Sequence, residues 1–186
     1  MILQIADVNY AEKGQLIHGA SAEINVYNPK VEPSQFTNAQ IWINGGPNEN
    51  PNYIMAGWTD RNTGDWWLAI KDDKTLVGYW PKSLFSYLAD GANSVSWGGL
   101  AKADSNGVSP PMGSGLFSKD YYSCFNHWMK IVNGDYNVTN PLAHPTRTSI
   151  RIRMDSANCF DIRYHDYALT SGTNIQFGGP GGAICT

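Results

Sequence analysis

The sequence is poor in charge, and this shortage excludes several classes of protein. Charged residues make up 16% of the 186 residues and the net charge is −3, so the basic excess that binds nucleic acid is missing. The many polar residues leave no apolar run long enough for a membrane-spanning helix. The first residues have no basic segment and no long apolar run, so they do not form a signal peptide. A cytosolic protein and a mature fragment with an added start methionine both fit, and the compartment stays undecided.

Cysteine and histidine are also scarce. The three cysteines are Cys124, Cys159 and Cys185, with no Cys-x-x-Cys pair, and the four histidines are scattered. This spacing predicts neither a metal site nor a cofactor. Cys159 and Cys185 both lie in the C-terminal segment, where they could close a loop as a disulfide. Asn137 begins a formal glycosylation sequon, Asn-Val-Thr, although such triplets often occur by chance.

Aromatic residues, glycine and proline are plentiful. The chain holds 7 Trp, 10 Tyr, 19 Gly and 10 Pro, and 42% of its residues are apolar. This composition predicts many short strands joined by tight turns. No shift in composition divides the chain, so we expect one domain over residues 1–186, folded as an all-β antiparallel sandwich with one short helix.

The order of apolar and polar residues places these elements. Apolar residues alternate with polar ones at period two, and the expected strands are 22–27, 39–44, 66–70, 76–80, 150–154, 160–164 and 175–177. Residues 66–70 and 76–80 are expected to form a hairpin around a turn at 72–74. The helix is expected at 83–90, because Leu84, Phe85 and Leu88 share a helical face and Gly91 follows as a cap. Residues 101–115 and 134–145 read as loops.

The expected strand at 39–44 offers a candidate binding surface. Gln40, Trp42 and Asn44 share one face, and Ile41 and Ile43 lie on the other. An aromatic ring flanked by amides suits stacking on a sugar or a peptide. The alternative is that both faces of the strand are covered and Trp42 packs against the second sheet.

A second candidate is a basic stripe. Arg151 and Arg153 project from one face of a strand, and Arg163 is expected on the neighbouring strand. Such a stripe could contact anionic headgroups, sulfated glycans or the carboxylates of a partner. The alternative is an ordinary solvated strand face.

Nine segments, in order along nearly the whole chain, carry a resemblance to a known family: residues 19–32, 34–36, 39–42, 56–58, 64–68, 77–85, 95–99, 112–115 and 177–181. Together they resemble the neprosin family of mostly plant, secreted proteins. The resemblance implies an antiparallel β-sandwich. It also implies an origin as a glutamic endopeptidase that cleaves at proline and uses two carboxyl groups across a cleft.

Both catalytic glutamates implied by the resemblance are replaced. The family carries a Glu directly before its Ala-Gly-Trp phrase, where this chain has Met55, and a Glu directly after its Trp-Gly-Gly phrase, where this chain has Leu100. Neither a thioether nor an isobutyl group takes up a proton. We therefore expect no enzyme activity and a filled cleft.

The chain is also shorter than the family pattern between Trp58 and Trp66, where several strands are missing. We expect an open sheet edge there, through which the protein could form a homo-oligomer. Cys159 and Cys185 match the family's C-terminal cysteine pair, which implies a disulfide and leaves Cys124 as a free thiol. Secretion is implied by the resemblance alone.

The expected function is therefore that of a non-catalytic binding protein acting on a glycan, a membrane surface or a receptor. A plant defence or insecticidal role is suggested only by the association of the family with plants. One alternative is a degenerate glutamic peptidase with relocated carboxylates, and the other is a self-assembling structural protein. The carboxylates weighed for relocation are Glu12, Glu23, Glu32, Glu49, Asp65 and Asp90.

Overall fold

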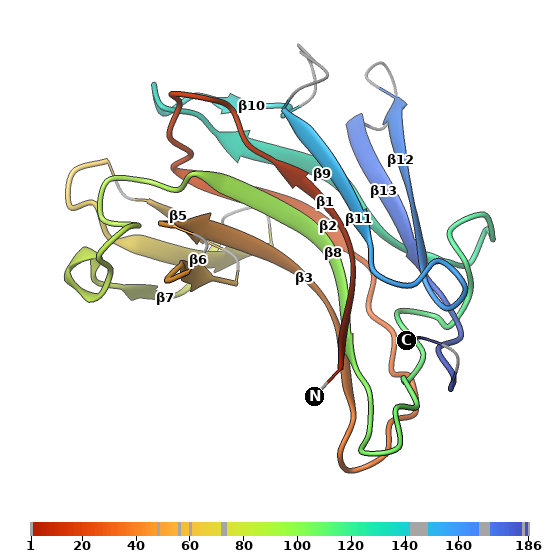
Figure 1. Ribbon diagram of the computed structural model, residues 1–186. Helices are drawn as coiled ribbons and strands as arrows, with labels where there is room; N and C mark the ends of the chain where they lie inside the picture. Colours follow the sequence, from red (N-terminus) through yellow and green to blue (C-terminus); the bar gives the residue numbers. More distant parts are fainter. Residues whose placement is uncertain are drawn as a thin grey trace.

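A computed structural model describes residues 2–47, 49–55, 57–59, 61–71, 74–141, 149–167, 172–183 and 185, with the backbone alone at 57–59 and 166–167. The described chain forms two antiparallel sheets (Figure 1). The five-stranded sheet has the order β11-β1-β8-β3-β4, with bounds β1 Leu3–Tyr10, β3 Phe36–Gly45, β4 Asn52–Ile54, β8 Ser94–Lys102 and β11 Ile150–Met154. The all-β antiparallel class predicted from the sequence is confirmed.

The second sheet has eight strands. Its order is β12-β13-β9-β2-β5-β6-β7, and β10 pairs with β9. The bounds are β2 Gly19–Ile24, β5 Gly57–Thr59, β6 Trp66–Ile70, β7 Thr75–Trp80, β9 Cys124–Val132, β10 Val138–Thr139, β12 Asp161–Tyr167 and β13 Gly172–Gly178. β6 and β7 pair antiparallel as the predicted hairpin, although part of its turn lies outside the described residues.

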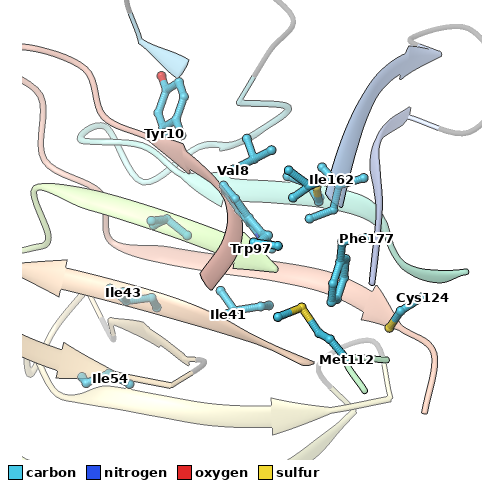
Figure 2. Packing of buried hydrophobic residues seen from close by; sticks show 14 of the residues in the cluster. Val8, Tyr10, Ile41, Ile43, Ile54, Trp97, Met112, Cys124, Ile162 and Phe177 are labelled. Carbon is cyan, nitrogen blue, oxygen red and sulfur yellow. The ribbon is translucent and has the colours of Figure 1, made fainter. Parts of the chain in front are cut away.

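The core lies between the two sheets. Val8, Ile41 and Trp97 from the five-stranded sheet meet Ile162 and Phe177 from the eight-stranded sheet (Figure 2). Met112, which lies in the long connection between β8 and β9, is fully buried with them. Burying these side chains supplies the main favourable free energy of folding, about 1.5–3 kcal/mol for each large apolar residue.

The glycines that follow Trp97 allow two close approaches. A Cβ atom at Gly98 would lie 2.1 Å from the carbonyl oxygen of Ala6 on β1. A Cβ atom at Gly99 would lie 2.5 Å from the sulfur of Met112 and 2.8 Å from the ring of Phe177. Because only glycine leaves this space, β1 can lie close against β8 while the core side chains pack directly on the backbone of β8.

Four expectations are corrected by the structure. Residues 83–90 do not form a helix: a 3-10 turn, η1 (Lys82–Leu84), is followed by bends. Leu84 is 65% exposed, whereas Leu88 is buried, so these apolar residues do not form one packed face. The strand expected at 22–27 ends at Ile24, and Val26 is 91% exposed. The loop expected at 134–145 contains β10, which pairs with β9, and the loop expected at 101–115 begins only after Lys102.

The predicted disulfide is present. Cys159 is bonded to Cys185 across a sequence separation of 26 residues, and Cys124 is a buried free thiol. Gln4 on β1 donates a hydrogen bond from its side chain to the carbonyl oxygen of Cys185. The C-terminal segment is therefore attached both to the loop that precedes β12 and to the five-stranded sheet.

Candidate functional site: the outer face of the five-stranded sheet

The five-stranded sheet has an inner face that packs on the core and an opposite face, which we call the outer face. Side chains alternate between the two faces along each strand, and the buried residues Ala6, Val8, Ile41, Ile43 and Trp97 mark the inner one. The outer face is formed by the alternate positions, which are Leu3, Ile5, Asp7, Asn9, Phe36, Asn38, Gln40, Trp42, Asn44, Ser94, Ser96, Gly98, Leu100, Lys102, Arg151 and Arg153. Two of the sequence-predicted groups, on β3 and β11, therefore share one surface.

One row of this face, which we call the central row, runs across four strands and consists of Arg153, Asp7, Gly98 and Gln40. Asp7 pairs with Arg153 of β11 on one side and with Gly98 of β8 on the other, and Gly98 pairs in turn with Gln40 of β3. Two strand spacings place the Cα atoms of Asp7 and Gln40 about 10 Å apart. Gly98 has no side chain, so nothing from β8 stands between the carboxyl and the amide.

The two neighbouring rows carry Leu100 and Met55, the positions that the resemblance matches to two glutamates. Leu100 pairs with Ile5 and Asn38, one row from Gly98, and is half-buried. Met55 follows Ile54, which pairs with Ile43. Extending this register brings Met55 level with Trp42 on the outer face, and Met55 is 58% exposed. By strand geometry the Cα atoms of Met55 and Leu100 lie about 16 Å apart, with Gln40 and Gly98 between them.

Several polar atoms of the outer face are buried without a hydrogen-bond partner among the described residues. They are Asp7 Oδ1, Asn38 Oδ1, Gln40 Nε2 and Asn44 Oδ1. A buried polar group that makes no hydrogen bond costs about 1–3 kcal/mol. A polar ligand that forms these hydrogen bonds would therefore stabilise the face, once small side-chain movements open the buried atoms to it.

Asp7 is the one carboxylate in the central row, and it is only 9% exposed. Burial raises the pKa of Asp7, and the carboxylate of Asp155 raises it further. A hydrogen bond with Ser96 and the charge of Arg153 lower the pKa of Asp7 but do not cancel the effect of burial. Arg153 is held by Asp155 through hydrogen bonds of 2.7 and 2.9 Å, so its charge is shared between the two carboxylates.

The structure brings some of the predicted residues together and separates others. Gln40, Trp42 and Asn44 share a face as predicted, and Trp42 is half-buried on the side away from the core. Arg151 and Arg153 lie on the same face, on β11, which is separated from β3 by β1 and β8. Arg163 lies elsewhere, because β12 pairs with β13 in the eight-stranded sheet and not with β11. The predicted three-arginine stripe is therefore limited to two residues, one of which is paired with Asp155.

The carboxylates weighed for relocation do not lie on this face. Glu12 accepts a hydrogen bond from Tyr10, Glu23 is on β2 in the other sheet, and Asp65 accepts a hydrogen bond from the backbone of Lys82. Asp7 was not among the residues predicted from the sequence. Its signal was the alternation of Ala6, Val8 and Tyr10 with polar residues, which marks a strand with Asp7 on the face away from the core.

Among the described residues, no group of three or more His, Cys, Asp or Glu side chains could hold a metal ion. His144 lies outside the described residues. The described part of the chain also contains no helix with the length and apolar character needed to cross a membrane.

The sequence model of the neprosin family matches residues 58–180, which is well over half of the chain. The match includes Leu100 and begins just after Met55.

Proposed function

Because this chain belongs to the neprosin family, we propose that it is a non-catalytic member that binds a glycan on the outer face of its five-stranded sheet. The observation that carries the proposal is the cluster of unpartnered polar atoms on Asp7, Asn38, Gln40 and Asn44 beside Trp42. A role in plant defence or insecticidal action is suggested only by the association of the family with plants.

The loss of catalysis follows from the chemistry at two positions. Hydrolysis by a carboxyl pair needs one group to take a proton from water and another to give a proton to the leaving amine. Met55 and Leu100 do neither. Met55 and Leu100 lie in the rows on either side of the central row. Glutamates at both positions would therefore extend towards each other over Gln40 and Gly98.

A glycan suits a sheet face better than a peptide strand does. An added strand binds at a sheet edge, where backbone N–H and C=O groups are free. On the outer face the backbone of β8 is paired on both sides, so recognition depends on side chains. Hydroxyl groups both donate and accept, which matches the free donor on Gln40 and the free acceptors on Asp7, Asn38 and Asn44.

The test is calorimetric titration with a panel of neutral oligosaccharides: cellohexaose, xylohexaose, chitohexaose and mannohexaose. We expect at least one to bind and Trp42→Ala to weaken that binding about tenfold or more, because a stacked ring is lost. Tyr121→Ala is the matched control, since Tyr121 is 86% exposed and lies outside the outer face. Failure of the whole panel to bind, or equal binding by Trp42→Ala, would refute the proposal.

One observation favours a second candidate, a degenerate peptidase. Asp7 pairs with Gly98, so it lies one diagonal step, about 7–8 Å, from the Leu100 position, and its pKa is raised by burial. If Asp7 acts as the acid, the protein cleaves proline-containing peptides at acid pH and Asp7→Asn abolishes the cleavage. That result would replace the binding proposal with the enzymatic one.

A further inference from the structure

A polar pocket lies on a different part of the molecule from the outer face. Its volume is about 200 Å³, and its lining includes His18, Arg61, Gly64, Lys82, Asp90 and Tyr136. We propose that this pocket binds a small oxyanion, the sulfate or phosphate group of a ligand. The inference is independent of the glycan site, because none of these residues lies on the five-stranded sheet.

A stack of three side chains builds one wall of the pocket. The ring of Tyr136 lies parallel to the ring of His18, with centroids 4.1 Å apart and an interplanar angle of 10°. The guanidinium carbon of Arg61 lies 5.4 Å from the centre of the same Tyr136 ring. This arrangement holds Arg61 in place and leaves its N–H groups available to donate hydrogen bonds to a ligand.

The backbone is strained where it positions Tyr136. Tyr136 has a φ of 63°, a left-handed conformation that costs a non-glycine residue free energy. The turn around it is held by Asn133, whose side-chain oxygen accepts hydrogen bonds from the backbone N–H groups of Asp135 and Asn137. Strain of this kind persists where the surrounding structure fixes it, and here it places the ring against His18 beside the pocket.

Lys82 supplies the second cation of the lining. Its side chain lies over Gly64, where an added Cβ atom would be 2.8 Å from the lysine Cδ and 3.5 Å from Nζ. Gly64 also has a φ of 76°, so glycine is needed both for the turn and for this contact. The backbone N–H of Lys82 donates to Asp65 at 3.0 Å, which fixes the start of η1 next to the pocket.

The charges around the pocket favour an anion. Within the described part of the chain neither Arg61 nor Lys82 forms an ion pair, whereas Arg153 pairs with Asp155. Among the described residues of the lining, Asp90 is the one acid, against the two bases Arg61 and Lys82. His18 is 7% exposed and burial lowers its pKa, whereas an anion bound nearby would favour its protonated form.

The experiment is an NMR titration of the labelled protein with sodium sulfate, sodium phosphate and glucose 6-sulfate. Sodium chloride at matched ionic strength is the control, because exposed cations are screened by salt. We expect saturable shifts at His18 and Tyr136 with the oxyanions and not with chloride, together with a higher pKa of His18 in the bound state. If glucose 6-sulfate binds more tightly than sulfate, the pocket recognises a sulfate or phosphate ester of an organic ligand. If the two bind equally, the pocket recognises a free anion.

Two variants locate the site. Arg61→Gln and Lys82→Gln, both at exposed positions, are each expected to weaken binding about tenfold, since each removes one charged hydrogen-bond donor. Lys119→Gln, an exposed lysine outside the lining, is expected to bind as the wild type does. The absence of saturable shifts, or unchanged affinity in both pocket variants, would overturn the proposal and leave the glycan site untouched.

Discussion

The substitution Gly98→Ala tests the geometry of the outer face at its centre. An added Cβ atom would lie 2.1 Å from the Ala6 carbonyl oxygen, 2.7 Å from the Asp7 Cα and 2.9 Å from the Asp7 Cβ. The first two are backbone atoms, so β1 must move away from β8 by about 1 Å to reach van der Waals contact. Such a shift weakens ladder hydrogen bonds worth about 1 kcal/mol each and adds an overpacking cost of about 1–3 kcal/mol.

We therefore expect Gly98→Ala to lower the free energy of unfolding by about 4 kcal/mol. For a chain of this size this corresponds to a fall in melting temperature of about 10 °C, measured by calorimetry. Gly78→Ala is the control, because Gly78 lies in edge strand β7 with nothing within 4 Å. It should change stability by about 0.5 kcal/mol or less. Equal melting temperatures for the two variants would refute the close approach of β1 and β8.

Three further predictions concern titration, the disulfide and the free thiol. Burial raises the pKa of Asp7 in the folded protein. The stability that comes from the protonated carboxyl is therefore fully present below the unfolded pKa of about 3.9, and it is lost as pH rises through the folded pKa. The Asp7→Asn variant, which lacks this carboxyl, should therefore become more stable relative to the wild type as pH rises from acid to neutral, as measured by urea unfolding. A difference in the free energy of unfolding that stays constant with pH would contradict this. Replacing Cys159 and Cys185 by serine should cost about 3.5 kcal/mol, from the 26-residue separation that the disulfide closes; a loss below about 1 kcal/mol would contradict it. Cys124, whose pKa burial raises to about 12, should react with a thiol reagent only in denaturant, and rapid labelling of the native protein would argue against its burial.

The strands could be predicted from the sequence where alternation is strict. Ile41 and Ile43 face the core as their period predicts, and β6 and β7 pair as the hairpin predicted from their separation. The helix expected at 83–90 failed because its apolar residues have different roles. Leu88 packs against Gly45, and its carbonyl oxygen accepts the indole N–H of the buried Trp66 at 2.8 Å. Leu84 meanwhile faces solvent.

The candidate site could be predicted only within single strands. The shared face of Gln40, Trp42 and Asn44 follows from period two. The position of Asp7 opposite Gly98 depends on pairing between segments some 90 residues apart, which no local pattern specifies. For the same reason the sequence did not assign β11 and β12 to different sheets, so Arg163 was grouped with Arg151 and Arg153.

Recognition of a glycan by the outer face is the proposal on which the other conclusions about the function of this face depend. Its most direct test is an NMR titration of the labelled protein with the oligosaccharide panel, following side-chain amide and indole N–H signals. We predict that the signals of Asn38, Gln40, Trp42 and Asn44 shift together, while the indole of Trp128, on β9 of the other sheet, does not move. Shifts confined to the eight-stranded sheet, or no shift with any oligosaccharide in the panel, would contradict the account.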